Sequence, residues 1–227
     1  MSASVSEHII TAIGQGHSGW VHTINLDILR LLVKNSEYAE LCKGTTLAVA
    51  DGMPLIWASR LMGQPLPERI AGSDLVSTLS GAAAQAGFSV FLLGGNPGTA
   101  EKAGLVLEKR YPGLRVAGTY CPAFGFENKP EIMEGIRQLV LSAAPDIVYV
   151  ALGVPRQERI IDWLRPEFSR TWWMGVGISF SFITGDVPRA PSWMQKVGLE
   201  WVHRLIQEPR RLAWRYLVED IPFVVQL

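Results

Sequence analysis

The chain has 227 residues, 48% of them hydrophobic, and carries 21 basic and 21 acidic side chains. This length and apolar content suffice for one sizeable folded domain and exclude a largely disordered chain. The lack of a basic excess removes the electrostatic footprint of a nucleic-acid-binding protein, so no nucleic-acid partner is expected. Cys42 and Cys121 lie far apart without a CxxC pair, which indicates a reducing compartment rather than a disulfide framework or a zinc site.

The predicted elements alternate between strand and helix along most of the chain. Short β-branched apolar runs predict strands near Gly19–Ile24, Thr45–Ala50, Phe88–Leu93, Arg115–Gly118, Asp146–Leu152 and Thr171–Gly175. The segments between them predict helices near Leu26–Leu32, Pro54–Met62, Asp74–Ala86, Thr99–Arg110, Pro130–Ala143 and Gln157–Leu164. This alternation is typical of an α/β, Rossmann-like fold, with a mostly parallel sheet and helices on both faces.

From about Pro188 onward the strand pattern stops, and tryptophans alternate with arginines up to residue 215. Pro209 interrupts this region because proline cannot continue a helix. We therefore predict a Rossmann-like domain over residues 1–190 and a helical appendage over residues 191–227.

The N-terminal stretch lacks the basic and then apolar segments of a signal peptide. The most apolar stretch, Trp172 to Thr184, is shorter than the roughly 18 residues that a membrane-spanning helix needs. The chain is therefore expected to be cytosolic or peripherally attached to a membrane.

Polar or glycine-rich turns follow four of the predicted strands. They are Thr23-Ile24-Asn25, Asp51-Gly52-Met53-Pro54, the glycine-rich turn 94–98 and the segment 153–158, which contains Gln157 and Glu158. In an open parallel sheet, ligands bind in the crevice outside the carboxyl ends of the strands. All four turns should open onto that edge, which makes it the predicted site.

Asp51 is the candidate general base. It follows an apolar strand and precedes a glycine that permits a tight turn, so its carboxylate can be partly desolvated. Desolvation raises a carboxyl pKa toward that of a working base. The alternative is an aspartate whose side chain merely caps the next helix.

Three further features suit a phosphate or sugar ligand, each with a structural alternative. The turn containing Gly94 and Gly95 lets backbone N–H groups approach an anion at the start of a helix, although a plain strand-to-helix turn fits as well. Arg69 precedes a helix and suits a diphosphate, unless it pairs with a neighbouring acidic residue such as Glu68 or Asp74. Gln157 offers a donor and an acceptor to a sugar hydroxyl, whereas Glu158 can simply complement its helix dipole.

Several known motifs are absent from the sequence. It contains no Walker loop, GxSxG elbow or HExxH, no GxGxxG follows its first predicted strand, and its four histidines have no metal-ligand spacing. No Asp-x-Asp occurs either, so the usual carboxylate pair for a metal-bound diphosphate is missing. We therefore expect no metal and no cofactor, and a diphosphate would have to be bound by arginines and backbone amides.

A series of short stretches across most of the chain resembles the WecG/TagA/CpsF glycosyltransferases of bacterial surface-polysaccharide assembly. These stretches are Thr23-Ile24-Asn25, Ala50 to Pro54, Glu68 to Asp74, Gly94-Gly95, Gly118-Thr119-Tyr120, Phe124-Gly125-Phe126, Ala151 to Glu158, Gly175-Val176-Gly177, Arg189 to Trp193 and Gly198 to Trp201. Each is loose alone, but in this order and spacing they are highly specific.

The resemblance implies an inverting, metal-independent transferase on the cytoplasmic face of the inner membrane. The donor would be UDP-N-acetylmannosamine, its uronic acid or UDP-glucose, and the acceptor a polyprenyl-diphosphate-linked saccharide in surface-polysaccharide or exopolysaccharide synthesis. Homo-oligomerisation stays open. The alternatives are a nucleotide-sugar-binding scaffold without turnover, which needs no base, and a Rossmann-type oxidoreductase, which is disfavoured because no GxGxxG follows the first predicted strand.

By position, the resemblance makes Asp51 the base, with Thr23 and Asn25 as pocket residues beside it. Arg69 would face the site, and Gln157 would contact the sugar. The family's C-terminal arginines are expected to close over the donor diphosphate and to sit on the membrane, and the candidates here are Arg204, Arg210, Arg211 and Arg215.

Overall fold

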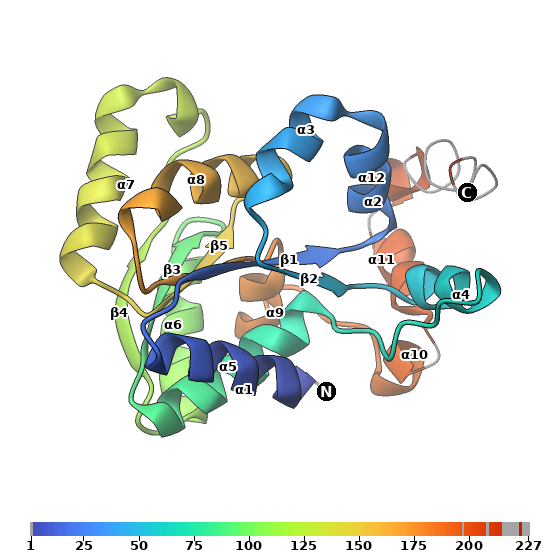
Figure 1. The fold of residues 1–227 in the computed structure, drawn as a ribbon, viewed down its shortest axis with the longest axis horizontal. Coiled ribbons are helices and arrows are strands. Elements are labelled where there is room, and N and C mark those ends of the chain that lie inside the picture. Colours follow the sequence, from blue (N-terminus) through green and yellow to red (C-terminus); the bar gives the residue numbers. More distant parts are fainter. Residues whose placement is uncertain (1, 197, 208, 215–222, 224–227) are drawn as a thin grey trace.

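A computed structural model describes residues 2–196, 198–207, 209–214 and 223. The chain forms one six-stranded parallel sheet with the strand order β2-β1-β6-β5-β3-β4 (Figure 1). The strands are β1 (Gly19–Ile24), β2 (Leu47–Ala50), β3 (Ser89–Gly94), β4 (Arg115–Tyr120), β5 (Ile147–Ala151) and β6 (Trp172–Gly175). All six predicted strands are confirmed, as is the α/β fold with a parallel sheet.

Helices cover both faces of this sheet. One face packs against α1 (Ser2–Gly14), α5 (Gly72–Ala86), α6 (Thr99–Arg110) and α9 (Ser179–Thr184). The other packs against α2 (Leu26–Lys34), α3 (Ser36–Leu41), α7 (Pro130–Ala143) and α8 (Arg156–Leu164). The six predicted helices are present, whereas α1, α3 and α9 were not predicted.

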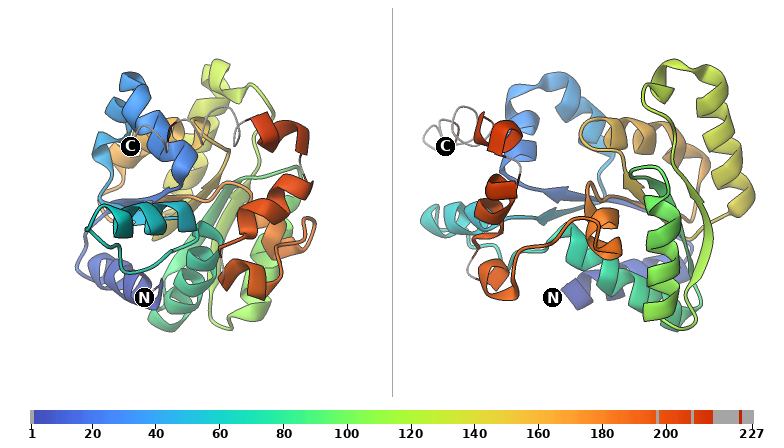
Figure 2. Two further views of the ribbon diagram at one scale, coloured as in Figure 1. Left: turned by 90° about the vertical axis from the view of Figure 1, so that its right-hand side faces the viewer. Right: turned by 180° about the vertical axis from the view of Figure 1, so that it is seen from behind.

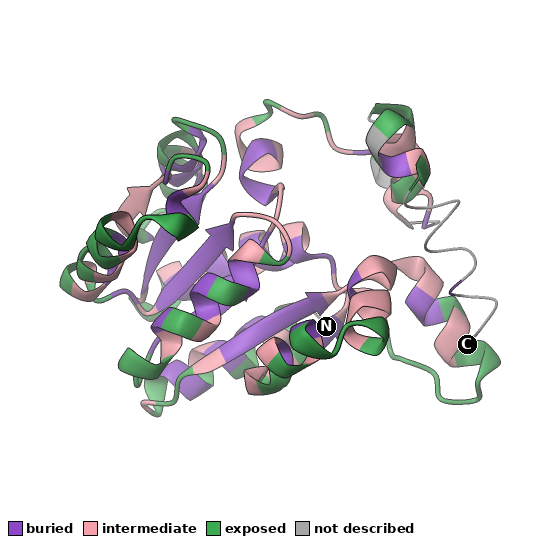
Figure 3. Cartoon of the chain, turned by 90° about the horizontal axis from the view of Figure 1, so that it is seen from above, coloured by how far each residue is buried: buried purple, intermediate pink, exposed green. Residues whose placement is uncertain are grey.

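Alternate side chains of the strands fill two separate cores. In β3, Val90 and Leu92 belong to the first core, and Phe91 and Leu93 to the second. Because both faces are covered, every residue of β3 and β5 is buried, which explains why these strands read as continuous apolar runs rather than alternating ones (Figure 3).

After β6 and α9 the described chain contains only helices: α10 (Ser192–Lys196), α11 (Glu200–Gln207) and α12 (Pro209–Trp214). Together with α4 (Met53–Leu61) they lie at one end of the molecule, beyond the carboxyl ends of β1 and β2 (Figures 1 and 2). The three helices agree with the predicted helical segment, while the domain boundary at residue 190 stays a prediction.

Candidate active site

The carboxyl ends of the strands meet at one edge of the sheet. Ile24 at the end of β1 pairs with Ala50 at the end of β2, and Gly94 at the end of β3 pairs with Ala151 at the end of β5. The four polar turns therefore open onto the same edge, as predicted. The candidate site lies on this edge.

Asp51 leaves β2 at this edge, and hydrogen bonds at both its backbone and its side chain hold it there. Its N–H donates to the Ile24 carbonyl at 2.7 Å, and its Oδ2 accepts the Gly72 N–H at 3.1 Å. The carboxylate thus caps α5 and not α4, the next helix along the chain, whose N-cap Gly52 makes no side-chain bond. Among the described residues, no hydrogen bond reaches the other oxygen, Oδ1, so that oxygen can accept a proton.

Thr23, at the end of β1, lies beside Asp51. A Cβ on Gly72 would be 3.5 Å from the Thr23 hydroxyl and 3.7 Å from the Asp51 Oδ2. The first residue of α5 therefore lies in van der Waals range of both side chains. Thr23 is buried and Asp51 half-buried, so the two form a partly desolvated floor to the site.

Burial raises the pKa of Asp51 above its ordinary value, because removal from water disfavours the charged carboxylate. The hydrogen bond from Gly72 and the positive charges of Arg69 and Arg204 oppose this rise, and the charge of Glu200 adds to it. The net direction is upward. A carboxyl group with a raised pKa and one unoccupied oxygen is suited to take a proton from a substrate hydroxyl.

Asn25 has a local structural task. Its Oδ1 accepts the Ile28 N–H at 2.9 Å and so caps α2. Its amide nitrogen and the second lone pair of Oδ1 could still bind a ligand, and the role as a pocket residue stays a prediction.

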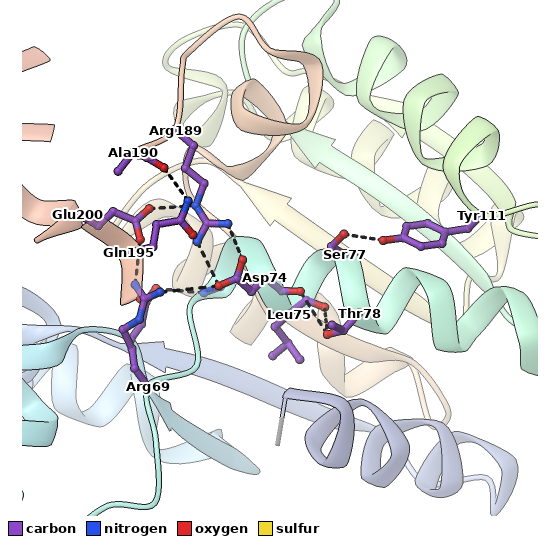
Figure 4. A network of polar contacts seen from close by, with 12 residues as sticks. Arg69, Asp74, Leu75, Ser77, Thr78, Tyr111, Arg189, Ala190, Gln195 and Glu200 are labelled. Carbon is purple, nitrogen blue, oxygen red and sulfur yellow. Dashed lines mark hydrogen bonds and ion pairs between the residues drawn. The ribbon is translucent and has the colours of Figure 1, made fainter. Parts of the chain in front are cut away.

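Arg69 belongs to an ion-pair network of four side chains (Figure 4). Its Nη1 donates to Glu200 Oε2 at 2.8 Å, and its Nη2 lies 3.8 Å from Asp74 Oδ2. Arg189 bridges the same two acids: its Nε is 3.0 Å from Glu200 Oε1, and its guanidinium bonds both oxygens of Asp74. The pairing of Arg69 with Asp74 was foreseen as the structural alternative, but the shorter contact is with Glu200.

This network fixes α11 to the start of α5. Burial alone would raise the pKa of Glu200, but the bonds from Arg189 and Arg69 hold it below its ordinary value, so the carboxylate stays charged. Neither Arg189 nor Glu200 was singled out from the sequence. The only signal was that both lie in stretches that carry the family resemblance.

The glycine-rich turn after β3 borders an open groove of about 800 Å³. Gly94 and Gly95 have φ of 102° and 84°, and a Cβ on Gly94 would lie 2.5 Å from the Ala151 carbonyl oxygen, so only glycine fits. The Gly95 N–H donates to that oxygen at 2.7 Å and is therefore not available to a phosphate. The groove is also lined by Cys121, Phe124, Arg156, Gly177 and Ser181.

Gln157 and Glu158 are buried at the start of α8, with 4% and 1% exposure. Gln157 Nε2 donates to Glu158 Oε1 at 2.8 Å, and Gln157 Oε1 accepts the Gly177 N–H at 3.3 Å. A Cβ on Gly175 would lie 2.6 Å from the same amide. Gln157 thus fastens the turn after β6 to α8, and the contacts with substrate predicted for these two residues stay predictions.

Behind Glu158 lies a buried polar cluster that was not predicted. His22 Nε2 is 3.8 Å from Glu158 Oε1 and 3.3 Å from the Tyr38 hydroxyl. Burial raises the pKa of Glu158 to about 7, lowers that of His22 to about 4 and raises that of Cys42 to about 11, so all three are neutral near pH 6. The only sequence signal was a histidine within an apolar strand.

Of the four candidate arginines in the C-terminal segment, the structure describes the side chains of two. Arg204 on α11 is half-buried, and its charge acts on Asp51. Arg210 on α12 is exposed. The side chain of Arg211 and the whole of Arg215, both predicted to bind the diphosphate, lie outside the described residues.

Among the described residues, no group of three or more His, Cys, Asp and Glu side chains is placed to hold a metal ion. None of the helices in the described part of the chain is long and apolar enough to cross a bilayer.

A family model and two individual relatives all match this chain to glycosyltransferases. The model of the "Glycosyl transferase WecG/TagA/CpsF family" matches residues 1–227. An N-acetylglucosaminyldiphosphoundecaprenol N-acetyl-beta-D-mannosaminyltransferase of Bacillus subtilis is 32% identical over 196 residues, which cover 86% of this chain and 73% of the relative. An enzyme of the same name from Bacillus spizizenii is 31% identical over 224 residues, covering 99% of this chain and 84% of the relative.

Proposed function

The chain belongs to the WecG/TagA/CpsF family of glycosyltransferases, and we propose that it transfers an N-acetylhexosamine from a UDP-sugar to a polyprenyl-diphosphate-linked saccharide. N-acetylmannosamine is the first choice of sugar because both relatives carry it in their names, as they do the undecaprenyl diphosphate of the acceptor. Its uronic acid and glucose remain alternative donor sugars. The product would enter a bacterial surface polymer or exopolysaccharide.

The observation that carries the proposal is the Asp51 carboxyl. Its Oδ2 is fixed by Gly72, and its Oδ1 accepts no hydrogen bond from the described residues. In the proposed step, Oδ1 takes the proton from the acceptor hydroxyl while the hydroxyl oxygen attacks the anomeric carbon. The bond from that carbon to the UDP oxygen breaks as the new bond forms, so the configuration inverts.

Charge grows on the departing UDP and needs positive partners, because a leaving diphosphate is stabilised by fixed charges and dipoles. We assign this task to Arg204, which is close enough to act on the pKa of Asp51, and to the further arginines of the C-terminal segment. Arg69 and Arg189 are already paired with Glu200 and Asp74, so their proposed role is to hold α11 in place. No step of this mechanism uses a metal.

The acceptor's lipid anchor implies a membrane surface, so we propose that the protein works at the cytoplasmic face of the inner membrane. Residues 1–190 would form the catalytic domain. Residues 191–227 would both complete the site and contact lipid, since arginines beside tryptophans suit a headgroup layer.

The direct test is a transfer assay with the purified chain, a panel of UDP-sugars and a polyprenyl-diphosphate N-acetylglucosamine acceptor. We expect the acceptor mass to rise by one N-acetylhexosamine and the reaction to survive EDTA. A protein that binds UDP-sugars without turnover would instead be a scaffold, and a chelated enzyme rescued only by Mg²⁺ or Mn²⁺ would contradict the metal-free mechanism.

A further inference from the structure

Exposed apolar side chains gather at one end of the molecule. Of the thirteen large hydrophobic residues described as exposed, eight lie in α4 and the turn after it or in helices α10 to α12. These elements share the end of the molecule beyond β1 and β2 (Figures 1 and 2). Scattered exposed leucines are ordinary, but such a concentration marks a contact surface.

The tip of α4 is the most prominent part of this surface. Every residue from 60 to 67 is exposed, in the order Arg-Leu-Met-Gly-Gln-Pro-Leu-Pro, so the segment has one cation and no acid (Figure 3). Leu61 is 89% and Met62 67% exposed. Exposure of two adjacent large apolar side chains to this extent is unfavourable in water and calls for a partner.

Hydrogen bonds to Ser59 hold the tip in shape. Ser59 Oγ donates to the Ile56 carbonyl at 2.8 Å and accepts the Leu66 N–H at 3.0 Å, and the Ser59 carbonyl accepts the Gln64 N–H at 2.9 Å. The root of α4 is anchored by the buried Leu55 and Ile56. The apolar side chains are therefore presented by an ordered turn and need no rearrangement to bind.

Helix α4, which carries the tip, is in contact with the C-terminal segment. A side chain on Gly198, in the turn before α11, would collide with Met53 and lie 3.3 Å from Trp57, so this turn packs directly on α4. Asp51 precedes α4 by two residues. A nine-residue helix is about 13 Å long, so Asp51 and the exposed tip lie at opposite ends of α4.

We propose that the α4 tip (residues 60–67) is a second membrane-docking element, which inserts Leu61 and Met62 into the headgroup–acyl boundary of an anionic bilayer beside helices α10 to α12. The inference rests on the proposed function, because a lipid-borne acceptor must be reached from the membrane plane. A bilayer fits better than a second copy of the chain, since Leu61 and Met62 directly follow Arg60 and the nearest acid on their other side, Glu68, is six residues beyond Met62. This order matches a layer of anionic headgroups.

The test uses the full chain in flotation with phosphatidylcholine vesicles, with and without phosphatidylglycerol. The double variant Leu61→Glu, Met62→Glu is compared with Leu105→Glu, which alters a leucine of 68% exposure on α6. We expect the double variant to lose roughly tenfold or more in affinity for anionic vesicles, and the control to bind like the wild type. Both should melt like the wild type and keep their affinity for UDP.

Flotation needs no substrate, so it separates failure of this inference from failure of the proposed reaction. Wild-type vesicle affinity in the double variant would overturn the proposal, as would an equal loss in Leu105→Glu. The proposal would also fall if the double variant changed a wild-type dimer into a monomer in solution but still bound vesicles, because the surface would then join two copies of the chain.

Discussion

Individual residues set the proton chemistry of this site, and Arg204 offers a test of it. The charge of Arg204 lowers the pKa of Asp51, whose net shift is nevertheless upward. Arg204→Ala should therefore raise that pKa further and move the acid limb of the pH–rate profile to higher pH. Arg204→Lys should restore the limb, and Arg210→Ala, which changes an exposed arginine, should leave it in place. An unmoved limb in Arg204→Ala would show that this charge does not act on the base.

Glu158 gives a pH-dependent stability test. Its pKa is about 7 in the folded chain and about 4.5 when exposed, so between these values the folded protein holds a proton that the unfolded chain has released. The protonated carboxyl therefore favours the fold at low pH, and this contribution is lost as pH rises through the window. Glu158→Gln removes the titration, so its stability relative to wild type should increase by up to about 1 kcal/mol per pH unit from pH 5 to 7.

Urea unfolding of both proteins at several pH values measures this difference. The His22 contribution has the opposite sign but is common to both proteins, since His22 has a pKa of about 4 and stays neutral across the window when folded. A difference between the two proteins that does not change with pH would mean that Glu158 is ionised in the fold.

At the scale of elements, Glu200 joins α11 to two arginines from other parts of the chain. Glu200→Gln should weaken this link and misplace Arg204, because removing one partner of a half-buried ion pair leaves the other charges unsatisfied. We expect turnover to fall by about tenfold, with faster limited proteolysis between residues 191 and 214. Glu167→Gln, which breaks an exposed pair with Arg137, is the matched control. Equal turnover in the two variants would contradict the role of Glu200.

Sequence patterns predicted best those elements whose burial leaves a clear pattern of apolar residues in the sequence. β3 and β5 are continuous apolar runs, and α6 and α7 have the bounds expected for them. The six-residue helices α3 and α9 were not predicted, because a helix this short gains its stability from tertiary packing and leaves little periodic pattern.

Only part of the site could be predicted from the sequence, because several of its contacts join residues that are far apart in the chain. The common edge of the sheet follows from parallel strands, so Thr23 and Asp51 could be brought together from the sequence. The pairing of Arg69 with Glu200 spans 131 residues, and the burial of Gln157 against Gly175 depends on how α8 meets β6. Local patterns do not contain either contact.

For the whole molecule, the described residues of the two cores lie between residues 5 and 183, and the buried Leu212 and Phe223 belong to neither core. Removal of residues 192–227 should therefore leave a folded, soluble chain, since no described side chain of either core is lost. Vesicle binding and most transfer activity should disappear, because Arg204 and the other C-terminal arginines go with the segment. Circular dichroism, flotation and the transfer assay measure the three properties. Unfolding would make the segment part of the core, and full activity would exclude its arginines from the chemistry.

The central claim is that Asp51 is the base of a glycosyl transfer, and the turnover of Asp51→Asn tests it most directly. The amide keeps the shape of the side chain and can still accept the Gly72 N–H, so the fold and the affinity for UDP should be retained. Turnover should drop by about 10²–10⁴-fold, the usual cost of losing a positioned base, while Asp186→Asn, at an exposed aspartate, should turn over like the wild type. A near-wild-type rate in Asp51→Asn would contradict the account.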